Sequence, residues 1–519
     1  MSYEEKFEKD LLQKLAAKGI YYSPPAVIPP MPKIRATYQA GVIDRLTASF
    51  GAASKSADSE ILASLSVMRA RSRTLSQNNV YMRKFLGALK VNIIGDEGIK
   101  LQSVVRDANG NFDKEANNAI EQSWADYCSD GVCDVTGEYS MNEIYSLALE
   151  SAARDGDVFL RIVRGWKENK YRFAVQLIEN DYLDEKYNRE LPNKNKIIMG
   201  VEKDAWGRRV NYHFLTRHPG DYYYGGSNYN VIPASDIIPL FMSERAGQTR
   251  GVPWSYAAMI MLNNIGAFAE TAIIAARCGA AKMGFYKTSD DGDLSKIATG
   301  VSDDGDFIDE VEPGVFTKLP VGWDFKEFNP DYPRGEFSEF NKAMLKGAAS
   351  GLLMAYSSIS SDLSDVNFSS IRSGKLEERD IYKFLQKWFI RKIPNKIFPQ
   401  WLDVALMTGR LKLPYAKFEK FNNPTWQARG FEWVDPKKDI EAEMLAINFG
   451  LKTRSEVVAS RGKDLRDVFE QLKREQDLAA ELGLTFSSGK TEAAARSGEE
   501  EDNGGQQSAA EKMGGNNDN

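Results

Sequence analysis

Residues that could carry out catalysis are few in this sequence, and they do not cluster. Only two histidines occur, His213 and His218. His213 lies in the middle of a predicted strand with no nucleophile motif nearby, which favours a structural role. Cys128 and Cys133 have no second pair of cysteines or histidines at the spacing of zinc ligands. The sequence therefore predicts no catalytic residue, no metal site and no cofactor.

Two weaker patterns could bind ions. Gly247-Gln-Thr-Arg-Gly251 has two glycines four residues apart and could form a phosphate-binding loop, although the P-loop lysine is missing. Asp303, Asp304 and Asp306 could bind a divalent cation, but they lack the spacing and the terminal glutamate of an EF-hand loop. A solvated loop is the favoured interpretation. A soluble enzyme that uses carboxylates or a metal is therefore a disfavoured hypothesis.

The composition indicates an ordinary soluble protein. The 519 residues carry a net charge of −6, with 42% hydrophobic and 27% charged residues. An acidic chain of this kind is not expected to bind nucleic acid over its whole surface. Three cysteines indicate a reducing compartment without a disulfide framework. The charged N-terminus lacks the apolar core of a secretion signal.

One apolar segment, residues 252–285, needs a test as a membrane span. Asn263, Asn264, Glu270 and Arg277 interrupt it, so no run of about 18 apolar residues remains. Charges at bilayer depth are expensive. We therefore expect a helix that is packed by protein on all sides, and no membrane partner.

The central element of the chain is a helix, a polar loop and a second helix. Residues 336–356 have an apolar helix face, and residues 357–368 break the helical period with serines, aspartates and an asparagine. In the second helix, cations recur every three or four residues and form a cationic stripe, which Pro394 ends or kinks. The stripe consists of Arg372, Lys375, Arg379, Lys383, Lys387 and Arg391. Salt bridges with acidic neighbours are favoured over contact with DNA.

The remaining elements predict an α+β fold that is mostly helical. Helical patterns cover residues 59–92, 113–127 and 141–155, and the cations of the first pattern are expected on a solvated face. They are Arg69, Arg71, Arg73, Arg83 and Lys84. Residues 93–105 predict a strand and a turn, and residues 156–241 predict antiparallel strands separated by turns. A helix rich in alanine and glycine follows, beginning at Pro253.

Three segments in chain order resemble the portal proteins of lambda-like tailed bacteriophages. They are Ala246-Gly-Gln-Thr-Arg-Gly-Val-Pro-Trp254, Ser361-Asp-Leu-Ser-Asp-Val-Asn-Phe-Ser-Ser-Ile-Arg372 and Trp433-Val-Asp-Pro436. The likeness covers about residues 60–475. Two positions depart from the family pattern: Ala246 replaces a proline, which changes the stiffness of the loop, and Pro239 replaces a polar residue.

The resemblance implies the portal fold, with a β-rich wing, a two-helix stem, a small α/β clip, a tunnel loop followed by a long helix, and a helical crown. Its parts would be an N-terminal arm (1–60), the wing (61–252, β-rich from 156), the stem helices (253–283 and 331–356), the clip (284–330), the tunnel loop (357–368), the long helix with the return to the wing (369–432), the crown (433–484) and a disordered tail (485–519).

The resemblance also implies the function. Such proteins form a ring, usually of twelve copies, at one capsid vertex, and double-stranded DNA passes through its channel during packaging and ejection. The implied partners are the major capsid protein, the terminase large subunit, which hydrolyses ATP, and a head-completion protein. The expected location is the virion, with the host cytoplasm during assembly. Another structural head component, such as a scaffold or connector, is the alternative.

Ten residues follow as site candidates. We expect the tunnel-loop residues to face DNA, without sequence specificity, and those are Ser360, Ser361, Asp362, Ser364, Asp365 and Asn367. Acidic side chains there would repel the DNA backbone and let it slide, whereas cations would hold it. The candidates for contacts within the ring or with the wing are Arg250, Arg372, Lys375 and Arg379.

Overall fold

The computed structural model describes residues 3–18, 45, 51, 53–221, 228–280, 284–288, 323–327, 336–364, 368–431, 436–461 and 465–484. The chain divides into two units, residues 1–56 and 57–519. The first unit contains helix α1 (Tyr3–Ala16), in which Lys14 pairs with Asp10 one turn earlier. The acidic run at 303–306, the proline-rich run at 24–32 and the tail from 485 lie outside the described residues.

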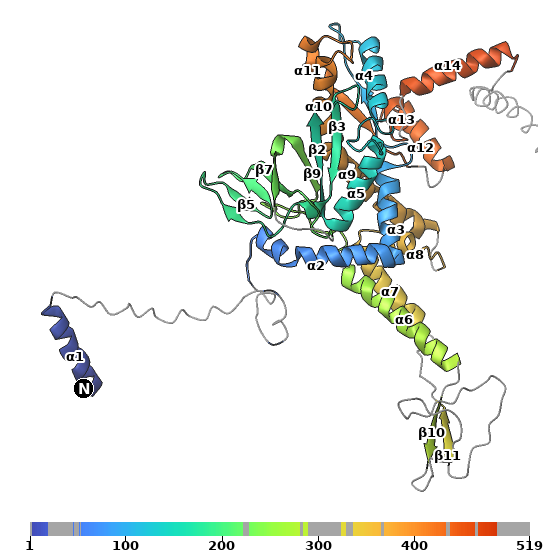
Figure 1. The fold of residues 1–519 in the computed structure, drawn as a ribbon. Helices are drawn as coiled ribbons and strands as arrows, with labels where there is room; N and C mark the ends of the chain where they lie inside the picture. Colours follow the sequence, from blue (N-terminus) through green and yellow to red (C-terminus); the bar gives the residue numbers. More distant parts are fainter. Residues whose placement is uncertain are drawn as a thin grey trace, which may run out of the picture. The chain divides into compact units, whose positions relative to one another are not determined.

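The second unit begins with four helices (Figure 1). They are α2 (Ala57–Asn78), α3 (Val80–Leu89), α4 (Lys114–Tyr127) and α5 (Met141–Asp155). Asn79 separates α2 from α3 because its side chain accepts the backbone N–H groups of Tyr81 and Met82. Ser140 and Glu143 form a capping box that starts α5. The predicted helical patterns at 59–92, 113–127 and 141–155 are therefore confirmed.

The β-rich region between residues 156 and 241 is also confirmed, as two antiparallel sheets. The central strand β2 (Asp157–Arg164) pairs with β3 (Phe173–Ile178) on one side and with β9 (Ile237–Phe241) on the other. The second sheet has the order β4-β5-β6-β7-β8. Its strands are β4 (Arg189–Glu190), β5 (Lys196–Ile198), β6 (Val201–Lys203), β7 (Arg209–Leu215) and β8 (Tyr229–Pro233), and the short helices η3 (Asn180–Tyr182) and η4 (Ala234–Asp236) lie in the connections.

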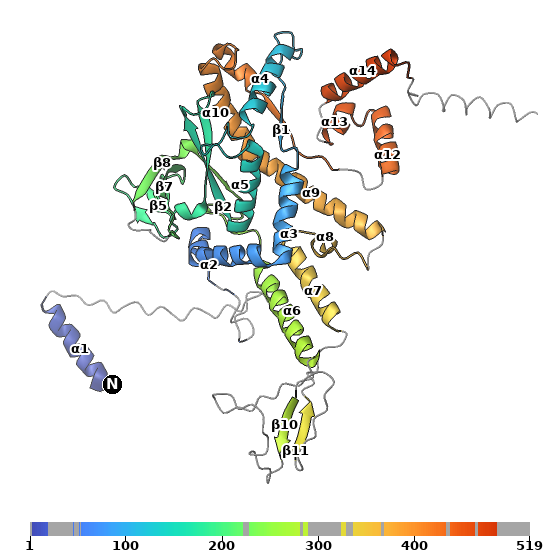
Figure 2. The ribbon, with the colours of Figure 1, turned by 45° about the vertical axis from the view of Figure 1, so that its right-hand side comes forward.

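Two long helices follow the sheets and pack against each other (Figures 1 and 2). They are α6 (Met259–Ala280) and α7 (Glu336–Gly351). Between them in sequence, β10 (Gly284–Thr288) and β11 (Trp323–Glu327) form an antiparallel pair. Both strands lie within residues 284–330, the segment that the resemblance assigns to the clip.

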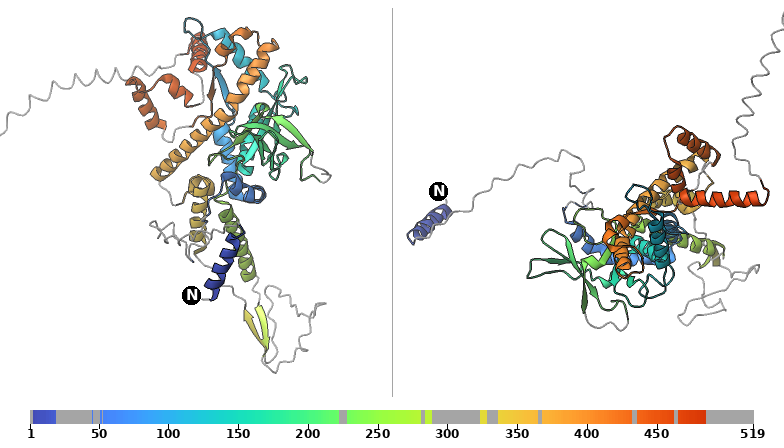
Figure 3. Two further views of the ribbon diagram at one scale, coloured as in Figure 1. Left: turned by 90° about the vertical axis from the view of Figure 1, so that its left-hand side faces the viewer. Right: turned by 90° about the horizontal axis from the view of Figure 1, so that it is seen from above.

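From residue 356 on, the described residues contain helices and one strand, and Figure 3 gives two further views of the whole ribbon. The helices are α8 (Tyr356–Ser360), α9 (Phe368–Lys392), α10 (Pro394–Met407), η6 (Tyr415–Lys417), α11 (Phe418–Phe421), α12 (Pro436–Asn448), α13 (Arg454–Ala459) and α14 (Leu465–Glu481). Strand β12 (Pro424–Gln427) returns to pair with β1 (Lys100–Ser103).

An aromatic cluster ties this return to the first helices. Trp124 of α4 contacts Trp401 of α10 edge to face, with ring centroids 5.0 Å apart, and Phe398 and Trp426 lie within 5.7 Å of the same ring. Trp124 and Trp401 are at most 4% exposed. Edge-to-face pairs of this kind add to the hydrophobic burial, so the cluster fixes the end of α10 against α4.

Three local predictions need correction. Ile93 and Ile94 belong to the π-helical turn η2 (Lys90–Ile94) that continues α3, and the strand begins only at Lys100. Pro253 starts a series of turns, and α6 begins six residues later at Met259. The first part of the polar loop is helix α8, because Ile359 is buried there. The prediction for Pro394 is confirmed, because α9 ends at Lys392 and Pro394 is the first residue of α10.

Candidate functional site: the α6–α7 pair, the loop after α8 and the long helix

Small residues allow α6 and α7 to approach closely, as the sequence predicts. A Cβ atom added at Gly351 would lie 3.3 Å from the Cβ of Ala258, and one at Gly347 would lie 3.0 Å from the sulfur of Met261. Further along the pair, Phe268 stacks on Phe337 with centroids 5.3 Å apart. The seam between the helices is therefore tightly packed.

The outer surface of the pair is apolar and exposed. Ile260, Ile273 and Ile274 of α6 and Phe340 of α7 are each at least half exposed. The segment Met259–Arg277 is long and apolar enough to cross a membrane by length and composition, and 22% of it is buried within the chain. The expectation of a helix enclosed by protein is therefore not met by the single chain. A surface of this kind marks a site of association.

The loop that follows α8 is organised by the carboxylate of Asp362. This carboxylate accepts the hydroxyl and the backbone N–H of Ser364, at 2.6 and 3.0 Å, and the hydroxyl of Tyr356 at 3.0 Å. The Ser364 contacts, together with Tyr356, hold the pKa of Asp362 well below its usual value. Lys342 of α7 lies 3.6 Å away. Asp362 is therefore charged, and its side chain remains about a quarter exposed.

Two contacts attach α8 to the neighbouring helices. Glu378 of α9 is buried, and its carboxylate accepts the hydroxyls of Ser358 at 2.5 Å and Tyr382 at 2.6 Å. Ser361, which has a left-handed backbone with φ of 59°, contacts the ammonium group of Lys84 on α3. The start of the loop is therefore held from both α9 and α3.

The structure brings together four of the six candidates for DNA contact. Ser360 bonds back to the carbonyl of Tyr356, Ser361 contacts Lys84, and Asp362 and Ser364 bond to each other. Asp365 and Asn367 lie outside the described residues. The four described residues thus form one short, hydrogen-bonded turn with one ionised carboxylate.

Arg250 lies in the interior of the chain, whereas a residue that contacts another copy would lie on its surface. Its side chain is fully buried, and its guanidinium group binds Asp157 at 2.6 Å and the carbonyls of Leu183, Met199 and Asn180. All these partners lie within residues 157–199 of the same chain. These contacts agree with the expected contact to the wing segment, whereas a fully buried side chain offers no surface to another subunit.

The backbone of residues 247–251 is likewise held by contacts within the chain. The backbone N–H groups of Thr249 and Gly251 donate to the carboxylates of Asp58 and Asp157. Gly251 lies so close to Gly156 that an added Cβ would meet its carbonyl oxygen at 1.9 Å. The N–H groups that a phosphate would need are therefore already occupied by carboxylates, so these residues lock a loop instead of cradling a phosphate.

The N-terminal half of the cationic stripe makes contacts within the chain. Arg372 pairs with Asp439 of α12 at 2.9 Å, and the guanidinium group of Arg379 lies 5.6 Å from the ring centre of Phe431. Lys375 is exposed. The expectation of acidic neighbours is thus met at Arg372, within the chain. Whether these cations also contact another copy remains a prediction.

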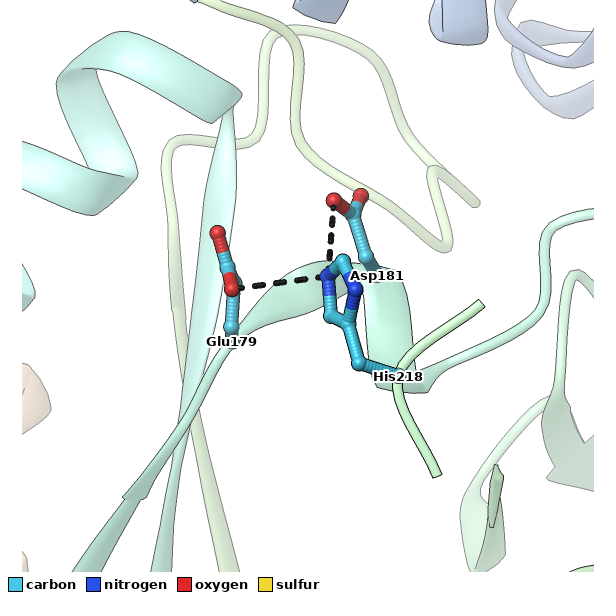
Figure 4. Close-up of side chains that lie close together, drawn as sticks. All are labelled: Glu179, Asp181 and His218. Atoms are coloured by element: carbon cyan, nitrogen blue, oxygen red, sulfur yellow. Dashed lines mark ion pairs between the residues drawn. The ribbon is translucent and has the colours of Figure 1, made fainter. Parts of the chain in front are cut away.

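Glu179, Asp181 and His218 form a cluster that the sequence analysis missed (Figure 4). Their spacing shows no metal-binding motif, and a loop brings His218 to the two carboxylates. His218 Nε2 lies 3.6 Å from Glu179 and 3.5 Å from Asp181. Its Nδ1 accepts the N–H of Gly220, which leaves the proton on Nε2, facing the carboxylates. Arg73 also binds both acids. The donor set therefore fits an ion-pair cluster better than a metal centre.

The cysteines are poor metal ligands as well. Burial raises the pKa of the Cys133 thiol to about 12 and also raises that of Cys128. Metal binding requires thiolates. That these two residues do not hold zinc stays a prediction.

Comparison with known proteins identifies the family. The model of the lambda family of phage portal proteins matches residues 44–386. The probable portal protein of Halomonas phage phiHAP-1 is 33% identical over 466 residues, which cover 88% of this chain and 90% of the relative. Portal protein B of Escherichia phage lambda is 20% identical over 477 residues, 82% of this chain and 86% of the relative.

Among solved structures, a chain in the neck of an empty gene transfer agent particle is 13% identical. The match has a TM-score of 0.41 and covers 79% of this chain and 96% of that one. The family match spans the two sheets, the α6–α7 pair, the loop after α8 and most of α9. The chain belongs to the lambda family of phage portal proteins.

Proposed function

We propose that copies of this chain form a ring, of twelve subunits, at one vertex of the phage capsid, and that double-stranded DNA passes through its channel. The observation that carries this proposal is the exposed apolar surface of the α6–α7 pair, which includes Ile260, Ile273, Ile274 and Phe340. Neighbouring subunits would cover it. In a ring, each interface joins two different faces of the chain and must close after a full turn.

The parts of the portal plan follow from this arrangement. Residues 61–252 are the wing, α6 and α7 are the stem, and the segment around β10 and β11 is the clip. The loop after α8 is the tunnel loop, α9 is the long helix, and α12 to α14 form the crown. The wing keeps its shape through the buried ion pair of Arg250 and Asp157.

The loop is the proposed point of closest approach to DNA. The ionised Asp362 would repel the phosphate backbone, so that DNA slides past without being held. The hydrogen bonds from Tyr356 and Ser364 keep the charge in a defined position. The chain would act as a passage, and the energy for packaging would come from the ATP-hydrolysing terminase.

The remaining partners follow from the place in the particle. The ring would contact the major capsid protein at the vertex, the terminase large subunit during packaging and a head-completion protein afterwards. The portal would be part of the virion, and it would occur in the host cytoplasm before assembly.

Electron microscopy of the purified protein tests the proposal. We expect rings with a central hole wide enough for duplex DNA, and native mass spectrometry should give the mass of twelve chains. Ile274→Glu on the exposed stem surface should reduce ring formation, whereas Trp206→Glu on an 88% exposed side chain in the wing should not. Compact monomers, or rings that form equally well with Ile274→Glu, would contradict the proposal. Particles without a hole would favour a scaffold or connector.

A further inference from the structure

Cations from three elements converge where the long helix meets the wing. Lys392 is the last residue of α9, Lys396 lies in the first turn of α10, and Arg209 begins β7. Burial, followed by the nearby charge of Arg209, lowers the pKa of Lys392. Burial, Lys392 and Arg209 lower the pKa of Lys396. The geometry agrees, because α9 contacts both α10 and β9, and Arg209 lies over the ring of Phe241 in β9.

Arg209 is fixed in this position by packing. Its guanidinium group donates to the carbonyl of Thr249 at 2.8 Å and to the hydroxyl of Tyr212 at 2.9 Å. It also lies 4.9 Å from the ring centre of Phe241, at the end of β9, and α9 packs against that strand. The guanidinium group cannot turn away from the two lysines without losing these contacts.

No carboxylate within the described part of the chain forms a salt bridge with Arg209, Arg391, Lys392 or Lys396. This is unexpected for a chain with 73 acidic and 67 basic residues. The other end of α9 differs, because Arg372 has the carboxylate of Asp439 at 2.9 Å. We call the four residues without such a partner the cationic junction.

We propose that the cationic junction binds the phosphates of double-stranded DNA and is a second DNA contact of the portal, separate from the loop after α8. The inference rests on the proposed function, because it assigns a further contact to the same partner. Residues 368 and 392 lie about 36 Å apart along α9, at about 1.5 Å per residue. The junction and the loop therefore contact different stretches of DNA.

The arrangement suits a regular polyanion better than an acidic protein segment. Lys383, Lys387 and Arg391 are exposed and follow one another at four-residue steps along α9 toward the junction. Lys383 pairs with the exposed Asp380 at 3.5 Å. These steps place a cation about every 6 Å along the helix. A duplex carries phosphates all along both strands, so such a row can contact several of them, and each contact gains from the release of counterions.

Covalently closed circular DNA separates this contact from the channel, because a closed circle has no end to thread. We would measure the binding of a fluorescent, relaxed minicircle to assembled full-length protein between 50 and 200 mM salt. The test variant is Lys392→Gln/Lys396→Gln. The control is Lys100→Gln/Lys196→Gln, which makes the same change in charge at two exposed lysines, one on β1 and one on β5.

We expect the test variant to bind about tenfold more weakly at 0.1 M salt and the slope of log K against log salt to fall by about 1.8, as for two lost phosphate contacts. The control variant should keep both the affinity and the slope. Unchanged binding, or an equal loss in both variants, would overturn the inference. The inference would also be overturned if the test variant bound poly-glutamate or inorganic phosphate more weakly than the native protein but bound the minicircle equally well. Each sample should also be imaged by electron microscopy. If rings are still seen, the inference fails but the proposed portal function stands.

Discussion

Arg250 and Asp157 form an ion pair that is closed off from solvent, with 2.6 Å between Nε and Oδ2 and side-chain exposures of 0% and 1%. The other oxygen of Asp157 binds Arg69 of α2 at 2.8 Å. Burial alone would raise the pKa of Asp157, but Arg250 and Arg69 outweigh it and hold the pKa below the ordinary value. Together with Arg69, this pair joins α2, strand β2 and the loop before α6.

Removing Arg250 should therefore destabilise the wing. In Arg250→Met, three backbone carbonyls lose their donor, and Asp157 keeps only Arg69 and the backbone N–H of Gly251 among these contacts. We expect a loss of about 3–5 kcal/mol in the free energy of unfolding, measured by urea denaturation. The matched control is Arg245→Met, whose exposed pair with Glu60 should contribute about 0–1 kcal/mol. Equal losses in the two variants would contradict the assignment.

Acid stability should depend on Glu202, which is buried in the five-stranded sheet. Burial opposes its charge, but Asn195, Asn211 and His213 donate to it and lower its pKa below the ordinary value of 4.5. A carboxyl group with a lowered pKa stabilises the fold above its unfolded pKa, and this contribution is lost as the pH falls through the folded value. Unfolding of Glu202→Gln should therefore vary less with pH below about 4.5 than unfolding of the native chain.

Urea unfolding at several pH values between 3 and 7 measures this difference. Glu143→Gln is a useful control, because Glu143 is an exposed capping residue whose pKa is also lowered, by the backbone and hydroxyl of Ser140. Its effect should be confined to the start of α5. Identical pH profiles for the native chain and Glu202→Gln would refute the prediction.

The close packing of the stem predicts a strict size limit at Gly351. In Gly351→Val, the new side chain meets Ala258, whose Cβ would be 3.3 Å away and belongs to a short, inflexible side chain. We expect a loss of about 1–3 kcal/mol from overpacking. Gly87→Val is the control, since a Cβ there has no neighbour within 4 Å. Thermal unfolding should separate the two variants, and a similar change in both would show that the seam tolerates larger residues.

The sequence predicts most of the helices and strands, but it does not predict which charged side chains are buried. Helical period and strand alternation predicted α2 to α5 and the β-rich region, because these patterns depend on residues close in sequence. Arg69 was expected on a solvated face, yet it is 4% exposed. Its partner Asp157 lies 88 residues away, and no local pattern reports such a distance. The cluster around His218 was missed for the same reason, whereas Arg71 and Arg83 are exposed as expected.

The charge of the loop after α8 should control how fast DNA moves. Replacing Asp362 and Asp365 by lysine turns repulsion of the phosphates into attraction, so packaging should slow. The effect should be larger at low salt, because screening shortens the reach of the added charges to about 10 Å at 0.1 M. Asp365 lies outside the described residues, so the structural argument rests on Asp362.

A single substitution separates the charge of Asp362 from its hydrogen bonds. Asp362→Asn keeps an oxygen that can accept the N–H and hydroxyl of Ser364 but removes the negative charge. If charge governs sliding, packaging by Asp362→Asn should be slower than native and faster than that of the double lysine variant. Packaging rates should be measured with full-length portals at several salt concentrations. Rates that stay the same in all three proteins at every salt concentration would show that this loop does not sense the DNA, because a charge change of four units per subunit at a point of contact must alter the attraction of the phosphates.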